Sequence, residues 1–167
     1  KYGVDLSRFS ARPRHHRSKP VVLTVARKVE EKGLKIWNML NAELGDQLDF
    51  RWLDAVPYKS IAKEYKKADI FLLPSIKTKT WEEQYGMALI EAMACGLPII
   101  TTNTGAIPEV VGSAAVLSNP DFNSIKANLL KLAESNNLIN KYQKLSRSRA
   151  VKYFDTLKQS HLLTELY

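Results

Sequence analysis

Residues 20–26 read Pro20-Val21-Val22-Leu23-Thr24-Val25-Ala26, a short run of β-branched and apolar side chains between a proline and Arg27. A continuous apolar run of this length, rather than an alternating one, is typical of a strand that is buried on both faces of a parallel sheet. This stretch therefore predicts the first strand of an α/β domain.

The alternation of strand and helix continues along the chain. Strands are predicted at 48–53, 69–73, 98–102 and 114–117, and helices at 34–44, 59–67, 85–95 and 108–111, with two or three more helices from Asn123 onward. We expect Ile36, Met39 and Leu40 to form the buried face of the first helix. Strands and helices in this order imply right-handed crossovers, a parallel sheet and helices on both faces. The predicted fold class is a doubly wound, Rossmann-like α/β domain.

Composition is that of a globular protein. The 167 residues are 45% hydrophobic and 25% charged, and no apolar run approaches the roughly 20 residues of a membrane helix. The single cysteine, Cys95, can form no internal disulfide, which favours a reducing compartment, and we expect the cytoplasm. The chain opens on Lys1 rather than Met, so we expect it to be part of a longer protein.

The formal net charge of +8 would attract nucleic acid, an anionic membrane surface or a phosphorylated small molecule, and charge alone does not choose among them. Much of the charge lies in residues 1–19, which we interpret as a solvated connector. Among its basic and histidine side chains are those of Arg8, Arg12, Arg14, His15, His16, Arg17 and Lys19.

Ligands of a doubly wound sheet bind outside the carboxyl ends of the strands, where the strand order reverses. The candidate loops are therefore 26–33, 53–58, 74–86 and 101–108. The first strand is not followed by G-x-G-x-x-G, and the chain contains no G-x-x-x-x-G-K-[ST]. Dinucleotide dehydrogenases and P-loop NTPases thus lack their usual signatures here.

Two cations, Arg27 and Lys32, lie in the loop after the first strand. A guanidinium, an ammonium and the N-terminal amides of a helix could together neutralise a pyrophosphate without a metal. The alternative is a solvated loop in which Glu30 and Glu31 pair with these cations. Spacing alone favours this alternative.

Two carboxylates mark the loop and helix that follow residue 74. We expect Gly86 in the first turn of helix 85–95, where the missing Cβ would let a phosphate or a sugar oxygen approach the free amides. Glu91 could accept hydrogen bonds from a ribose and Glu83 from a hexose. Alternatively, Glu83 complements the helix dipole and Glu91 is an exposed helical residue. Glu91 lies in an almost wholly apolar helix, however, so it needs a partner or a ligand.

These fragments, in this order, resemble the retaining GT-B glycosyltransferases called glycosyltransferase family four, or group one, over nearly the whole chain. The most specific resemblance is a pair of glutamates with seven residues between them, followed by A-M-A-x-G-x-P. The matching fragments are Gly3-Val4-Asp5, Arg8-Phe9, Arg27 with Lys32-Gly33, residues 68–75 and residues 83–98.

The resemblance implies a function for each matching residue. Arg27 and Lys32 would bind the diphosphate of a nucleotide-sugar donor, Glu91 its ribose and Glu83 the transferred sugar. The implied catalytic residues are Arg27, Lys32 and Glu83, and the implied donor-binding residues are Val56, Ser75, Tyr85, Gly86, Met87, Glu91 and Gly105. The amides of 85–87 would face the sugar and distal phosphate, and the backbone at Ala55 and Val56 the base.

The sequence departs from the family pattern at two positions. Ala26 stands where the family commonly has Gly, and Ala106 where a second Gly usually follows Gly105. Each places a methyl group near the expected phosphates and sugar, which could change the donor's pose. Glu109 is better interpreted as a helix-terminal residue.

The implied reaction is transfer of a sugar from a nucleotide-diphosphate donor to a glycan, a lipid-linked or a small-molecule acceptor, with retention of configuration and without a metal or cofactor. This chain would be the donor-binding half of a two-domain enzyme and inactive alone. We expect a connector at 1–19, the nucleotide-sugar-binding domain at 20–150 and a helix at 151–167 packing toward an acceptor-binding domain. The complete enzyme could associate peripherally with the membrane.

Other functions stay open at this point. A nucleotide-sugar epimerase usually lacks the Glu83 and Glu91 pair, and a phosphorylase needs a cofactor-binding lysine motif that is not found. A non-catalytic basic module would bind nucleotides or polyanions such as nucleic acid, through residues 141–158. We expect no nucleic acid partner, because the charges of this stretch would mostly be solvated.

Overall fold

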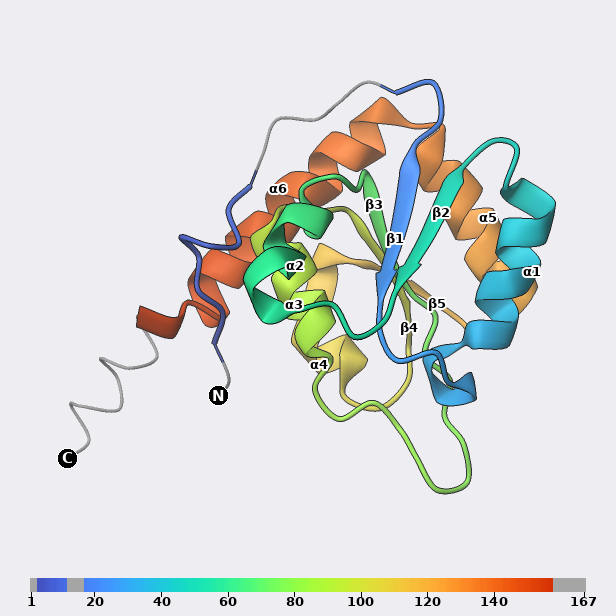
Figure 1. Cartoon of the computed structure of the whole chain (residues 1–167), viewed down its shortest axis with the longest axis horizontal. Helices are drawn as coiled ribbons and strands as arrows, with labels where there is room; N and C mark the ends of the chain where they lie inside the picture. Colours follow the sequence, from blue (N-terminus) through green and yellow to red (C-terminus); the bar gives the residue numbers. More distant parts are fainter. Residues whose placement is uncertain (1–2, 12–16, 158–167) are drawn as a thin grey trace.

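The strands form one parallel sheet of five, in a computed structural model that describes residues 3–11 and 17–157 (Figure 1). They are β1 (Val21–Val25), β2 (Asp49–Leu53), β3 (Ile70–Leu73), β4 (Ile99–Thr102) and β5 (Val116–Ser118), in the order β2-β1-β3-β4-β5. All residues of β3 and β4 are buried. The predicted parallel α/β fold is confirmed.

Helices connect the strands and follow the last one. They are α1 (Leu34–Leu44), α2 (Tyr58–Tyr65), α3 (Met87–Ala94), α4 (Ile107–Val111), α5 (Phe122–Ala133) and α6 (Asn136–Tyr153), with 3₁₀ turns η1 (Glu30–Lys32) and η2 (Gly112–Ala114). None of the helices in the described ranges is long and apolar enough to cross a bilayer. Residues 158–167, where we expect part of the last helix, lie outside the described residues.

The helices cover both faces of the sheet. Val21 and Leu23 of β1 point into a core cluster shared with α2, α3 and α4, whereas Val22 points into a second cluster shared with α1 and α5. Figure 1 shows α1 and α5 on one side of the strands and α2 and α3 on the other. Helix α6 contributes Ile139 to one cluster and Ala150 to the other. This is the doubly wound arrangement that the sequence predicts.

Two details of the helices differ from the prediction. In α1 the buried side chains are Trp37, Leu40 and Leu44, whereas Met39 is 42% exposed. The predicted face with Met39 and the observed face with Trp37 both have helical spacing. Packing against the sheet buries the face that carries the large Trp37 indole. Helix α3 begins at Met87 because Gly86 has φ +66°, which no right-handed helix contains. Gly86 is therefore the N-cap and not part of the first turn.

The beginning of the described chain is less solvated than we expected of a connector. Val4 and Phe9 are buried in the core, and the Val4 amide donates a 2.7 Å hydrogen bond to the Phe154 carbonyl. The Thr156 amide in turn donates to the Val4 carbonyl at 3.2 Å. The two ends of the described chain are thus paired. Arg12, Arg14, His15 and His16 lie outside the described residues.

Two buried tryptophans differ in whether their indole N–H is satisfied. Trp52 Nε1 donates to the Ala26 carbonyl at 2.7 Å, whereas Trp37 Nε1 has no partner within the described part of the chain. Trp52→Phe is therefore expected to lower the free energy of unfolding by about 1 kcal/mol more than Trp37→Phe does, because Trp37→Phe removes only an unpaired donor. Guanidinium unfolding of the two variants measures this difference. Equal losses would mean that the bond to Ala26 contributes nothing.

Candidate functional site

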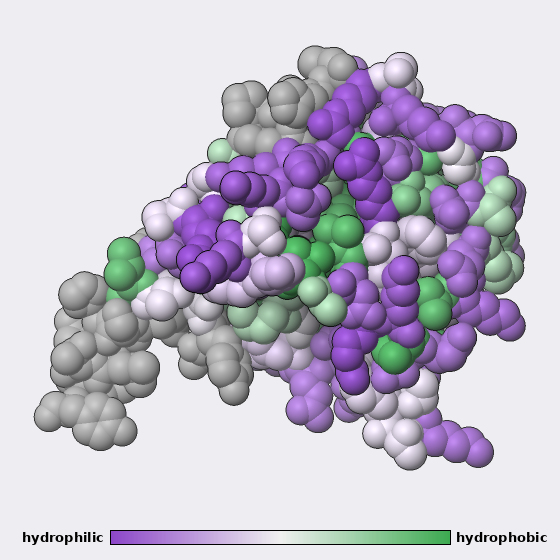
Figure 2. Space-filling view, viewed as in Figure 1, coloured by the Kyte–Doolittle hydropathy of each residue, from purple (hydrophilic) through white to green (hydrophobic). Residues whose placement is uncertain are grey.

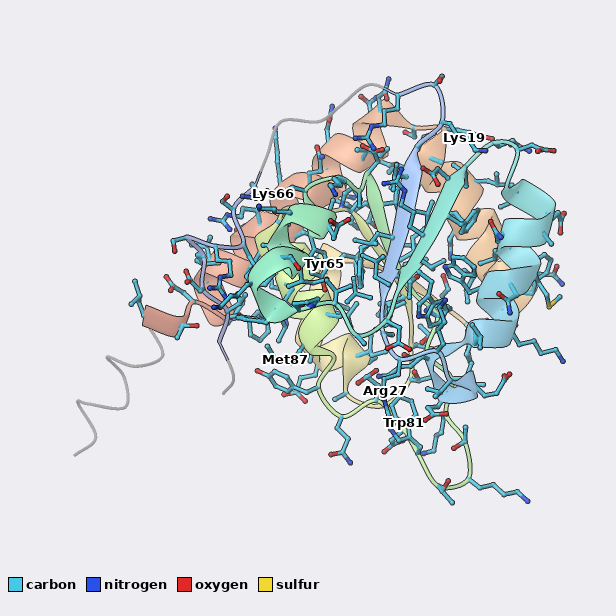
Figure 3. The ribbon with its side chains drawn as sticks, viewed as in Figure 1. Lys19, Arg27, Tyr65, Lys66, Trp81 and Met87 are labelled. Carbon is cyan, nitrogen blue, oxygen red and sulfur yellow. The ribbon has the colours of Figure 1, made fainter. Side chains whose placement is uncertain are left out.

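The candidate site lies at the carboxyl ends of the strands, where β1 has β2 on one side and β3 on the other. In a sheet of this order the connections leave in opposite directions from that point and open a crevice. The loops after β1 and β3 meet there, since the Ile76 amide donates to the Glu31 carbonyl at 3.0 Å. Figure 3 shows Arg27 and Trp81 at this end of the molecule and Lys19 at the opposite end.

Lys32 and Glu83 form an ion pair that joins the two loops. Lys32 Nζ lies 2.5 Å from Glu83 Oε2, and Ser75 Oγ donates to the same oxygen at 3.3 Å. Glu83 is 6% exposed, and the lysine side chain 15%. The Lys32 ammonium also lies over the Trp81 ring, 4.6 Å from its centroid. Three predicted site residues, Lys32, Ser75 and Glu83, are therefore in one largely buried cluster.

Arg27 is placed differently. Its side chain is 69% exposed, and its guanidinium lies 3.9 Å from Glu31, four residues further along the chain. This is the kind of pairing that the alternative of a solvated loop anticipates. An exposed pair at this distance contributes little stability and leaves the guanidinium able to reorient toward an anion.

A cavity of about 480 Å³ opens between α2 and the ends of β1 and β2. It brings together Arg27, Val56 and Glu91, which the sequence analysis assigned to one ligand. In Figure 2 an apolar area lies in this part of the surface, bordered by hydrophilic side chains. Ala55 also lines the cavity and has φ +54°, a conformation that costs an L-residue roughly 1–2 kcal/mol. The lining residues are Val25, Ala26, Arg27, Leu53, Asp54, Ala55, Val56, Tyr58, Ile61 and Glu91.

The partner that Glu91 requires is Tyr65 of α2. The fully buried Tyr65 hydroxyl donates to Glu91 Oε2 at 2.8 Å and lies 3.3 Å from the Ala88 carbonyl. Burial raises the pKa of the Glu91 carboxyl above its ordinary value, and the hydrogen bond from Tyr65 offsets part of that rise. Burial and the charge of Glu91 raise the pKa of Tyr65 well above its ordinary value. Glu91 is thus held at the cavity wall.

Glu91→Gln is expected to stabilise the domain at neutral pH. Because the pKa of Glu91 is raised, the folded state binds the proton of this carboxyl more tightly than the unfolded chain does. The stability of the wild type therefore falls as the pH rises from the ordinary pKa of glutamate to the raised pKa of Glu91 in the folded state. The gain from Glu91→Gln should vanish toward the ordinary glutamate pKa of 4.5. For the role at a ribose that the resemblance implies for Glu91, we expect binding of a nucleotide sugar to weaken about 10- to 100-fold, as for a lost hydrogen bond to a charged group.

Thermal unfolding across this pH range tests the first expectation and calorimetric titration the second. The control is Glu134→Gln, which changes an exposed carboxylate that ends α5. A stability gain that is the same at every pH would show that the charge of Glu91 is not its origin.

Two glycines shape the loops around Glu83. Gly86 caps α3 and has no side chain of its own that could accept from the first-turn amides of this helix. Gly105 has φ +54°, and a Cβ there would lie 2.2 Å from the Glu83 carbonyl oxygen. The Ala106 amide donates to that same oxygen at 2.9 Å. The loop after β4 therefore packs on the backbone of Glu83. This packing requires a glycine at position 105 whether or not the loop contacts a ligand.

The remaining predicted residues lie around these features. Met87 is 39% exposed at the start of α3. Tyr85 and Ala106 line a second cavity of about 370 Å³, which faces α4 and α6. Glu109 is exposed in the first turn of α4, as expected of a helix-terminal residue. The roles of the site residues in donor binding and catalysis stay predictions, as does the absence of a metal.

Sequence reasoning missed two aromatic residues of the site, Tyr65 and Trp81. Tyr65 lies 26 residues before Glu91 in the chain, and only the packing of α2 on α3 brings them together. Trp81 precedes Glu83 by two positions in a loop with no periodicity. The need of Glu91 for a partner was readable from its apolar helix, but the identity of that partner was not.

Comparison with known proteins adds an independent observation. The family model described as "Glycosyl transferases group 1" matches residues 38–149. The O-antigen chain mannosyltransferase B of Escherichia coli is 35% identical over 82 residues, 48% of this chain and 20% of the relative. The amylovoran biosynthesis glycosyltransferase of Erwinia amylovora is 28% identical over 165 residues, 79% of this chain and 40% of the relative. The chain thus spans less than half the length of these relatives.

Solved structures show the same fold. Anabaena HepE in complex with UDP and glucose superposes with a TM-score of 0.78 at 17% identity, over 98% of this chain and 55% of that one. The C-terminal domain of a glycosyl transferase group 1 family protein from Francisella tularensis gives 0.68 at 19% identity, over 92% of this chain and 100% of that one. With the family model matched over residues 38–149, this chain belongs to the glycosyl transferases group 1 family.

Proposed function

We propose that this chain is the donor-binding half of a glycosyltransferase that moves a sugar, with retention of configuration, from a nucleotide diphosphate to an acceptor. The observation that carries the proposal is the cavity at the switch point, which has Glu91 in its wall and Arg27 at its rim. The complex of the Anabaena relative with UDP and glucose supports a nucleotide-sugar ligand.

We assign one role to each part of the site. Arg27, Lys32 and the uncapped first turn of α3 bind the diphosphate, and Glu91 accepts from the ribose hydroxyls. Both hydrogen bonds that the Glu83 side chain accepts from the described residues use Oε2, so Oε1 is available to a sugar hydroxyl. Val56 and its neighbours provide an apolar wall for the base.

The proposed chemistry follows from where charge develops. When the bond between the anomeric carbon and the phosphate oxygen breaks, negative charge grows on the leaving diphosphate. We propose that Arg27, Lys32 and the amides at the start of α3 stabilise that charge without a metal. The acceptor hydroxyl attacks the anomeric carbon from the face that the diphosphate leaves, and its proton passes to the departing phosphate oxygen. We propose that the acceptor is held by a further domain, outside this chain.

Calorimetric titration of this chain with UDP-glucose, GDP-mannose and ADP-glucose tests the proposal. We expect binding of at least one of them, weak because the acceptor-binding half would not cover the ligand. A folded sample that binds none at millimolar concentration contradicts the proposal. An epimerase would instead convert the sugar of its nucleotide donor without any acceptor, which chromatography of the reaction mixture detects.

A further inference from the structure

We propose that Trp81 is a positioning residue that holds the Lys32 ammonium between Glu83 and the donor's diphosphate. The inference rests on the function proposed above and concerns a residue outside the stretch 83–98, where the resemblance to the family is most specific. It starts from the ring of Trp81, whose centroid lies 4.6 Å from Lys32 Nζ.

A lysine side chain has a flexible four-carbon stem, so fixing its ammonium requires contacts on more than one side. Lys32 has two such contacts, the Glu83 carboxylate at 2.5 Å and the Trp81 ring. With only 15% of the lysine side chain exposed, the ring shields one side of the charge from water. An ammonium desolvated in this way is attracted more strongly both to the ring and to an incoming phosphate.

Trp81 itself is held independently of Lys32. Its amide donates to Thr78 Oγ1 at 3.1 Å, and its carbonyl accepts from the Thr78 amide at 2.8 Å. These bonds close a turn in the long loop between β3 and α3, which extends beyond the carboxyl ends of the strands in Figure 1. The backbone of Trp81 is therefore held independently of Lys32, and its ring lies over the ammonium.

The arrangement divides the donors of the ammonium between two partners. An ammonium has three N–H donors, and one is directed to Glu83 Oε2. The ring covers one further side, which leaves the remaining donors to a phosphate. Without the ring, the ammonium would be solvated and would sample other rotamers. We expect the loss of the ring to weaken binding of a nucleotide sugar about tenfold.

Two replacements of Trp81 and one control test the inference. Trp81→Leu removes the π-face, Trp81→Phe keeps one, and Tyr142→Leu removes a ring that lies 5.6 Å from the Lys141 ammonium on α6, away from the cavity. Each is titrated with the nucleotide sugar that the wild type binds among UDP-glucose, GDP-mannose and ADP-glucose, and with the matching nucleoside monophosphate.

Trp81→Leu should weaken binding of the nucleotide sugar about tenfold and leave binding of the monophosphate unchanged, because the monophosphate lacks the distal phosphate and the sugar. Trp81→Phe should restore most of the affinity, and Tyr142→Leu should bind as the wild type does. If Trp81→Leu binds both ligands as the wild type does, or weakens both equally, the inference is wrong. A wild type that binds no nucleotide sugar overturns the proposed function first, and this inference with it.

A measurement without ligand tests the position of the Lys32 side chain separately from the binding of a nucleotide sugar. The ring should shift the Lys32 Hε proton resonances upfield in the wild type and in Trp81→Phe, but not in Trp81→Leu, with Lys32→Met identifying the signals. Normal shifts of these protons in the wild type would disprove the positioning role whether or not a nucleotide sugar binds.

Discussion

Replacing Lys32 by Met is expected to lower the free energy of unfolding by about 3 kcal/mol and, in the complete enzyme, to slow sugar transfer about a hundred- to a thousandfold. The loss of stability arises because Glu83, 6% exposed, would keep a charge with Ser75 as its only hydrogen-bond donor among the described side chains. The loss of rate arises because a cation beside the leaving diphosphate would be missing. Guanidinium unfolding and initial rates measure the two effects.

The double variant Lys32→Met/Glu83→Gln separates the two effects. A neutral amide at 83 removes the uncompensated charge, so most of the lost stability should return. Transfer should stay slow, because neither the cation nor the carboxylate has been restored. A double variant that transfers sugar at the wild-type rate would contradict both assigned roles, and a stable single variant would show that the ion pair is weak.

Arg27→Gln is expected to slow transfer about a hundred- to a thousandfold as well, but to change the free energy of unfolding by less than about 0.5 kcal/mol. The difference from Lys32 lies in exposure. The Arg27 side chain is 69% exposed and has a distant pair with Glu31, so its removal leaves no buried charge. Its contribution to transfer depends on a contact that forms only with the donor.

Lys28→Gln is the matched control for Arg27. Lys28 is the next residue of the same loop, is exposed, and is absent from the cavity lining. Its replacement removes the same formal charge, so a general electrostatic effect would slow both variants alike. Transfer by Arg27→Gln at the rate of Lys28→Gln would mean that Arg27 does not bind the diphosphate.

Local patterns predicted the elements well because each depends on neighbours in the chain. The apolar run at 21–26 and the run at 69–73 became β1 and β3, since a strand covered on both faces needs apolar side chains at every position. The buried face of α1 was predicted less well. Two overlapping apolar stripes satisfy the helical period there, and only the sheet decides whether Met39 or Trp37 is covered.

The start of α3 shows a similar limit. A glycine near a helix start is compatible with the first turn and with the cap, and the sequence predicted the former. The left-handed φ of Gly86 makes it the cap, which leaves Tyr85 before the helix. The first-turn amides that face the expected ligand thus begin two residues later than the pattern suggested.

The sequence by itself determined the class of the fold, the end of the sheet at which we expect a ligand, and the demand of Glu91 for a partner, because periodicity and the cost of burying a charge are local properties. Only the tertiary structure decided which residues come into contact. Lys32 and Glu83 are 51 residues apart in the chain, and Tyr65 and Glu91 are 26 apart. Such pairs depend on how loops and helices pack across the sheet, and no short-range pattern in the chain encodes that packing.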